Sequence, residues 1–147
     1  MRKKVVAAGT FDLIHPGHVM FLREAKRLAG PGGELVVIVA RDETVKKFKG
    51  REPVLSEEER LRIVSSLKPV DRAILGDLED LLSPIIRERP DVLVLGYDQW
   101  PDEERLREEL TRRGLECEVV RLPKFECLHP SSTSIIERIV KIFCGRE

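Results

Sequence analysis

The chain has 147 residues, the size of one ordinary domain, and its 26 basic side chains are balanced by 26 acidic ones. Without an excess of positive charge, and with no apolar run longer than residues 35–40, it lacks the features of a nucleic-acid-binding, membrane-spanning or secreted protein. We therefore expect a single cytoplasmic domain over residues 1–147 that binds neither nucleic acid nor membrane.

Short runs rich in β-branched residues alternate with helical patterns along the chain. The expected strands are residues 5–8, 35–40, 72–75, 92–95 and 117–122. This alternation predicts parallel strands joined by crossover helices. The runs 35–40 and 92–95 are apolar on both faces, so we expect them in the middle of the sheet. The expected fold is α/β, a Rossmann-like, open, mainly parallel five-stranded sheet with helices on both faces.

Capping residues mark the ends of the expected helices. Pro16 suits a first helical turn, and the glycine-rich residues 30–33 end that helix. Ser56 and Glu59 form a capping box at the start of another. The remaining helices are expected at residues 83–89, 102–113 and 131–143. The last of these has one apolar face, made by Ile135, Ile136, Ile139, Val140 and Phe143.

The stretch Gly9-Thr-Phe-Asp-Leu-Ile-His-Pro-Gly-His18 directly follows the first strand and opens the first helix. In an open α/β sheet this position faces the ligand crevice, and the start of a helix attracts phosphate. His15 and His18 are three residues apart and can both turn toward one bound anion, while Gly17 lets that anion come close. The stretch matches neither a Walker loop nor a Gly-x-Gly-x-x-Gly loop.

Three further segments follow strands or open a helix. The basic loop at 40–51 is suited to closing over phosphates, or is a solvated run of charges. Residues 96–100 carry the only tyrosine and the only tryptophan, which serve a ligand or local packing. Residues 131–134 offer a row of hydroxyls to an anion, or only cap the last helix.

The Gly-Thr-Phe-Asp and His-x-Gly-His elements at 9–12 and 15–18 resemble the signature of the cytidylyltransferase-like nucleotidyltransferases. The resemblance implies that an acceptor phosphate attacks the α-phosphorus of a nucleoside triphosphate and that pyrophosphate leaves, without a covalent enzyme intermediate. It also implies that His15 and His18 are catalytic hydrogen-bond donors. Mg²⁺ or another divalent cation is expected to bind through the triphosphate oxygens, with no metal site of the protein's own.

The same resemblance assigns binding roles residue by residue. Arg60 aligns with an arginine that contacts the triphosphate, and residues 96–98 align with a Gly-x-Asp that binds nucleotide. Ser131 replaces the isoleucine of the family's Ile-Ser-Thr-Thr element. The expected nucleotide-binding residues are Gly9, Thr10, Phe11, Pro16, Gly17, Lys46, Lys49, Arg60, Gly96, Asp98, Ser132, Thr133 and Ser134. The expected acceptor-binding residues are Asp12, Tyr97 and His129.

Details outside the signature, at residues 40–43, 68–71, 95–99 and 117–127, resemble the archaeal branch of the family that transfers AMP from ATP to FMN. That branch often has Cys-x-x-Cys where this chain has Cys127-Leu-His-Pro130, with only the first thiol. Two alternatives stay open: CTP-dependent transfer to glycerol 3-phosphate, and a nucleotide sensor without turnover. Because relatives of this kind are commonly homodimers, a homodimer is expected.

Overall fold

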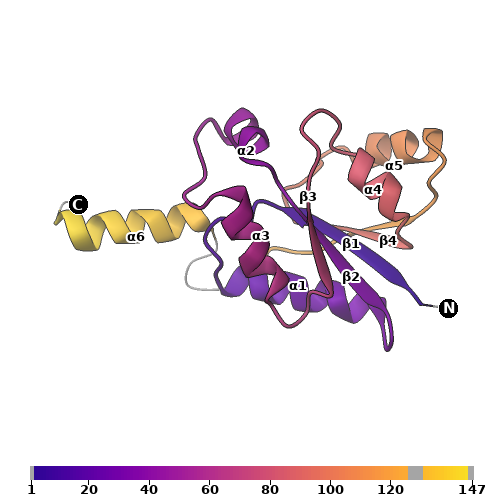
Figure 1. The fold of residues 1–147 in the computed structure, drawn as a ribbon, viewed down its shortest axis with the longest axis horizontal. Helices are drawn as coiled ribbons and strands as arrows, with labels where there is room; N and C mark the ends of the chain where they lie inside the picture. Colours follow the sequence, from indigo (N-terminus) through magenta and orange to yellow (C-terminus); the bar gives the residue numbers. More distant parts are fainter. Residues whose placement is uncertain (1, 126–130, 146–147) are drawn as a thin grey trace.

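A computed structural model describes residues 2–125 and 131–145 of the chain. In this part of the chain five strands form one sheet in the order β3-β2-β1-β4-β5, and all neighbouring strands are parallel (Figure 1). The strands are β1 (Lys4–Gly9), β2 (Glu34–Val39), β3 (Arg72–Leu75), β4 (Val92–Leu95) and β5 (Glu118–Arg121). The helices are α1 (Pro16–Ala29), α2 (Asp42–Lys49), α3 (Glu57–Ser65), α4 (Ser83–Glu88), α5 (Glu103–Arg112) and α6 (Ser132–Cys144).

The strand order places a crevice at a defined point of the sheet. β1 is the middle strand and pairs with β2 on one side and β4 on the other. The two runs that are apolar on both faces are therefore interior strands, as expected, but they flank the centre rather than form it. The order reverses between β1 and β4, and ligands of open α/β sheets bind beyond the strand ends at such a reversal.

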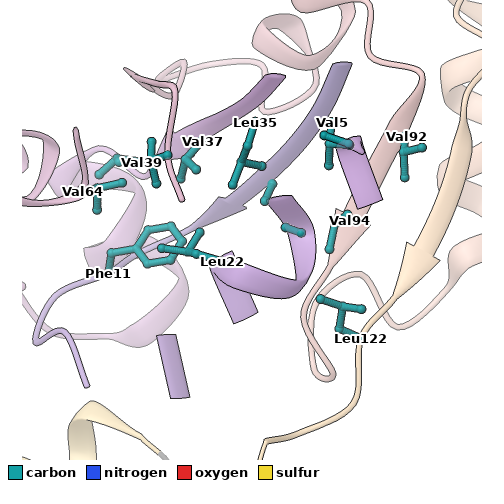
Figure 2. Packing of buried hydrophobic residues seen from close by; sticks show 14 residues of the cluster. Val5, Phe11, Leu22, Leu35, Val37, Val39, Val64, Val92, Val94 and Leu122 are labelled. Atoms are coloured by element: carbon teal, nitrogen blue, oxygen red, sulfur yellow. The ribbon is translucent and has the colours of Figure 1, made fainter. Parts of the chain in front are cut away.

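Each face of the sheet has its own apolar core. On one face, side chains of β1, β2 and β4 contact Leu22 and Ala25 of α1 and Val64 of α3, and Figure 2 shows this cluster. On the other face, alternate residues of the same strands contact Ile85 of α4 and Leu106 of α5. The two clusters confirm the predicted α/β fold with helices on both faces.

The basic segment after β2, expected as a loop, is mostly the helix α2. Asp42 and Glu43 lie at its first turn and three lysines at its last, an arrangement that complements the helix dipole. Val45 is buried and anchors the helix to the body, and Gly50 ends it in the left-handed conformation with φ of 73°. The many charged residues of this segment predicted a loop. The structure shows instead a helix whose one buried residue is Val45.

The last helix, α6, extends away from the sheet (Figure 1). Ser131 caps its start by accepting a hydrogen bond from the amide of Ser134, but none of the helix residues is buried. Of its predicted apolar face, Phe143 is 80% exposed, Val140 47% and Ile139 45%, while Ile135 and Ile136 are partly buried. Over the described residues, each helix is too short or too polar to traverse a lipid bilayer.

Candidate functional site

A cavity of about 710 Å³ opens at the carboxyl ends of the strands. Its wall takes residues from the segments that follow β1, β2, β3, β4 and β5 and from the first turn of α6. This volume is in the range of sites that hold a small organic ligand. The cavity therefore lies where the strand order predicts a ligand crevice.

Two histidines cap the start of α1. The Nδ1 atom of His15 accepts a hydrogen bond from the amide of Gly17 at 3.1 Å. The Nδ1 atom of His18 accepts one from the amide of His15 at 3.2 Å. A nitrogen that accepts a hydrogen bond carries no proton, so in the neutral form of each ring the proton is on Nε2. The helix cap thus fixes the tautomer of both imidazoles and leaves Nε2–H as the donor of each ring.

The two imidazoles are close neighbours on the cavity wall. Their ring centroids are 3.9 Å apart, and the ring of Phe11 is 5.4 Å from that of His18. Burial of His18, together with the positive charges of His15 and Lys49, lowers the pKa of His18 from 6.5 to about 4. His18 is therefore neutral near pH 7 and acts as a hydrogen-bond donor rather than as a cation.

The loop after β1 has a strained turn at Phe11, whose φ is 53°. The ring of Phe11 is buried and folds back over Gly9, where an added Cβ would come within 2.8 Å of it. Gly9 is thus needed for the packing of a neighbouring side chain, a role that sequence analysis did not assign to it.

Asp12 fastens this loop to the segment before α3. Its side chain is only 4% exposed, and its two oxygens accept hydrogen bonds from the amides of Val54 and Leu55, both at 2.8 Å. The carboxylate shapes the cavity wall by holding two loops together, so its contact with an acceptor stays a prediction.

Arg60 is fully buried and is absent from the described cavity wall. Its Nη1 donates to the carbonyl of Thr10 at 2.8 Å, and its Nε donates to the carbonyl of Leu55 at 3.0 Å. Its Nη2 forms an ion pair with Asp42 at 2.7 Å. The guanidinium thus joins three segments of the protein, and its expected contact with a triphosphate stays a prediction.

The basic residues of α2 separate into two groups. Lys49 lines the cavity, whereas Lys46 lies 3.5 Å from Glu43 and 3.8 Å from Glu52. Arg51, just beyond the helix, also lines the cavity. Of the two predicted lysines, Lys49 is the one that the structure places beside the histidines.

The turn after β4 and the start of α6 also contribute to the cavity wall. Tyr97 and Asp98 lie on the wall, and the ammonium group of Lys124 is 5.5 Å from the centre of the Tyr97 ring. Ser132 and Thr133 also line the wall, and the hydroxyl of Ser132 donates to the carbonyl of Leu13 at 3.4 Å. The contact with Leu13 places the hydroxyl row beside the histidine loop.

Most of the predicted site residues meet on this wall. Those that the structure brings together are Gly9, Thr10, Phe11, Asp12, His15, Gly17, His18, Lys49, Gly96, Tyr97, Asp98, Ser132 and Thr133. Outside the described wall are Pro16, Lys46, Arg60 and Ser134. His129 and Cys127 lie outside the described residues, so their predicted roles are not addressed.

Sequence analysis missed several residues of the wall. Arg41, Leu81, Ile85 and Lys124 all line the cavity. Arg41 and Lys124 directly follow strand ends and were within reach of the argument that found the other loops. Leu81 lies just before α4 and Ile85 lies within it, on the second face of the sheet. No pattern in the sequence distinguishes these two residues from ordinary core residues.

Comparison with known proteins gives one family and several full-length relatives. A family model described as cytidylyltransferase-like matches residues 6–138. A Korarchaeum cryptofilum protein named FAD synthase is 56% identical over all of this chain and 98% of its own length. A Ferroglobus placidus protein of the same name is 58% identical, over 98% of this chain and 92% of its own.

A solved structure has a similar fold. It is a Thermoplasma volcanium protein described as a lipopolysaccharide core biosynthesis protein, with a TM-score of 0.79 and 40% identity. The similarity covers 86% of this chain and all of that one. The fold of this chain is therefore shared with a protein of known structure.

We expect Arg60→Met to lower the free energy of unfolding by about 2 kcal/mol, because it leaves the carbonyls of Thr10 and Leu55 and the carboxylate of Asp42 without their donor. Chemical denaturation measures this change. Arg62→Met, on the exposed side of the same helix, is the control and should change stability by about 0.5 kcal/mol or less. An Arg60→Met protein as stable as the wild type contradicts the joining role.

We expect His18 to titrate near pH 4 in the protein without nucleotide, as followed by the NMR shifts of its ring. Its pKa in the folded protein lies below the ordinary 6.5, so the unfolded chain binds the proton more tightly between these values. The stability that depends on neutral His18 is therefore complete above pH 6.5 and is lost as the pH falls toward 4. His18→Gln should reduce this pH dependence, and a midpoint near 6.5 contradicts the burial argument.

Proposed function

This chain belongs to the cytidylyltransferase-like family, and we propose that it is an FMN adenylyltransferase, which makes FAD and pyrophosphate from FMN and ATP. An oxygen of the FMN phosphate attacks the α-phosphorus of ATP and forms a new P–O bond, while the bond between the α-phosphorus and its bridging oxygen to the β-phosphorus breaks. The observation that carries the proposal is the pair of imidazoles fixed by the cap of α1 at the cavity, in a chain whose full-length relatives are named FAD synthase.

The histidines are the proposed catalytic groups. In both rings Nε2–H is the available donor, because Nδ1 accepts a hydrogen bond from a backbone amide. Negative charge grows on the phosphate oxygens in the transition state, and donors that are already oriented stabilise that charge without reorganisation. The positive end of the α1 helix dipole adds to this effect. His15 and His18 therefore stabilise the transition state, and neither forms a covalent bond with substrate.

The groups around the histidines hold the triphosphate. Lys49 supplies a positive charge, and Thr10, Ser132 and Thr133 supply hydroxyl and amide donors from two different elements. Two elements that converge on one anion fix its orientation, and such positioning accounts for a large part of the rate of phosphoryl transfer. Arg60 contributes indirectly, because it fixes the carbonyl of Thr10 and hence the loop that carries the donors.

The divalent cation of the reaction is proposed to enter with ATP. Asp12 is the carboxylate in the histidine motif, and both of its oxygens already accept backbone amides. It is thus engaged in holding loops and is poorly placed to serve as a metal ligand. Mg²⁺, which binds readily to phosphate oxygens and keeps several waters, fits this arrangement as a bridge between oxygens of the triphosphate.

The nucleoside and the acceptor share the turn after β4. Asp98 is proposed to accept hydrogen bonds from the ribose, and Tyr97 to contact the acceptor. Both substrates are metabolites of the cytoplasm, where we expect the enzyme to act.

Transfer of CMP to glycerol 3-phosphate is less well supported, because such a small acceptor would leave much of a 710 Å³ cavity empty. A sensor without turnover would not need the fixed tautomers of the two histidines.

A homodimer is proposed on the basis of α6. The exposed apolar side chains of this helix include Ile139, Val140, Ile142 and Phe143. A second copy of the chain is a suitable cover, since a chain with zero net charge does not repel its own copy over long distances. The start of the same helix lines the cavity, so pairing of α6 would also steady the hydroxyl row.

The transfer reaction is tested by the mass of its product. With ATP, CTP and FMN in one mixture, we expect a product with the mass of FAD and the release of pyrophosphate. His15→Ala and His18→Ala should each lower kcat by about a hundredfold or more, as loss of an oriented donor does elsewhere. Arg23→Ala, on the exposed side of α1, is the control. Unimpaired transfer in either histidine variant, or a product that contains cytidine, contradicts the proposal.

The dimer is tested by sedimentation at several protein concentrations. We expect Phe143→Glu to raise the dissociation constant of the dimer at least about tenfold, since a buried carboxylate without a partner is strongly unfavourable. Lys141→Gln, which also changes the net charge by −1 but on the polar face of the helix, is the matched control. A wild-type protein that stays monomeric at all concentrations overturns the proposal.

A further inference from the structure

The cavity has two chemically different ends. The end beside α1 and α6 carries His15, His18 and Ser132. The other end is lined by Ile38, Leu81, Ile85 and Trp100, which are apolar or aromatic. Ile38, Ile85 and Trp100 also contact the core on the α4 and α5 face of the sheet (Figure 1). The cavity thus extends across the carboxyl edge of the sheet, from the side of the two histidines to the side of the apolar residues.

In-line transfer requires the attacking and leaving groups to lie on opposite sides of the α-phosphorus. The hydroxyl row of α6 lies on the α1 side, where Ser132 contacts the loop that carries the histidines. With the pyrophosphate held there, the acceptor phosphate approaches from the opposite side. The rest of the acceptor then extends toward the apolar end of the cavity.

Trp100 is held in an unusual backbone conformation at this apolar end. Its φ is 46°, a value that residues with a side chain rarely adopt. The preceding residue, Gln99, braces the turn: its Oε1 accepts from the amide of Gly96 at 2.8 Å, and its Nε2 donates to the carbonyl of Ala8 in β1 at 3.0 Å. An added Cβ at Gly96 would lie 3.4 Å from that same Oε1, which is an ordinary van der Waals contact.

Arg121, at the end of β5, forms hydrogen bonds with the same turn. Its Nη1 donates to the carbonyls of Gly96 at 2.8 Å and Gln99 at 2.6 Å. Its Nη2 donates to the carbonyl of Trp100 at 2.7 Å, and its Nε is bonded to Glu103 at 2.8 Å. A strained conformation persists only where its surroundings enforce it, and such positions are often functional. One guanidinium therefore fixes the backbone that carries Trp100.

We propose that the apolar end of the cavity is the subsite for the flat heteroaromatic ring of the acceptor, that the indole of Trp100 contacts this ring, and that Arg121 is the residue that positions Trp100. The inference rests on the proposed transfer to FMN and adds the place of its isoalloxazine. A wide tricyclic ring needs an extended apolar wall with an aromatic face, which the side chains at this end supply.

Fluorescence tests whether FMN binds near the turn that carries Trp100, because Trp100 is the one tryptophan of the sequence, and the Trp100 variants test contact with the ring. FMN should quench the tryptophan emission of the full chain in a saturable manner, and ATP alone should leave it nearly unchanged. The absence of saturable quenching by FMN, with or without a nonhydrolysable ATP analogue, overturns the inference. This measurement needs no turnover, so it tests the subsite even if the wild-type protein makes no FAD, a result that would overturn the proposed function alone.

Kinetic measurements test the roles of the two residues. Trp100→Leu should raise the KM for FMN about tenfold and change the KM for ATP less than about twofold, whereas Trp100→Phe should keep most of the affinity. Arg121→Met should raise the KM for FMN in the same way and weaken the quenching. Arg107→Met is the matched control, because Arg107 contacts Glu103 and Val119 and lies outside the hydrogen bonds of the turn.

The outcomes distinguish the role of Trp100 from that of Arg121, and the ring subsite from the proposed function. A Trp100→Leu enzyme with an unchanged KM for FMN, or with equal increases for FMN and ATP, overturns the ring subsite while FAD formation by the wild type stands. An Arg121→Met enzyme that differs from the wild type only in stability, with unchanged KM values and quenching, overturns the positioning role. If Trp100→Leu fails to fold, Trp100→Phe and the quenching of the wild type decide the matter.

Discussion

The candidate site depends on one buried guanidinium. Arg60 is fully enclosed and bonds the loop after β1 at Thr10, the segment before α3 at Leu55, and the start of α2 at Asp42. A buried charge is tolerated only when hydrogen bonds and an opposite charge satisfy it, so these three segments are held in one arrangement. Asp12 repeats the connection with two backbone amides on the same segment. The loops that form one side of the cavity are thus fixed by side chains behind it.

On this fixed base the start of α1 serves two purposes. The two histidines take the place of the usual capping residues, since their Nδ1 atoms accept the amides that a serine or aspartate would otherwise satisfy. The same bonds decide which nitrogen of each ring holds the proton. Burial keeps His18 neutral near pH 7, with its pKa at about 4. The stability of a helix end and the orientation of the proposed catalytic donors therefore come from the same contacts.

The sequence predicted much of the site because its residues follow strand ends, and strand ends of a parallel sheet meet at one edge. It could not give those contacts of a residue that depend on what surrounds it in the folded chain. Arg60 matches a ligand-binding position, yet three segments surround its guanidinium and occupy it. Lys46 and Lys49 are equivalent in the sequence, and only the direction of α2 places Lys49 at the cavity. Gly9 makes room for the ring of Phe11, a contact between near neighbours that a positive φ produces.

The sequence by itself determined the alternation of strands and helices, the caps that begin α3 and α6, and the segment that carries the histidines, because periodicity, capping and turn chemistry act over a few residues. The tertiary structure alone decided which strand is central, which charged groups are buried, and that the cavity has an apolar end braced by Arg121 and Gln99. These features join residues that are far apart in the chain. Their free energy comes from burial and hydrogen bonds that exist only after the sheet has formed, so no local pattern records them.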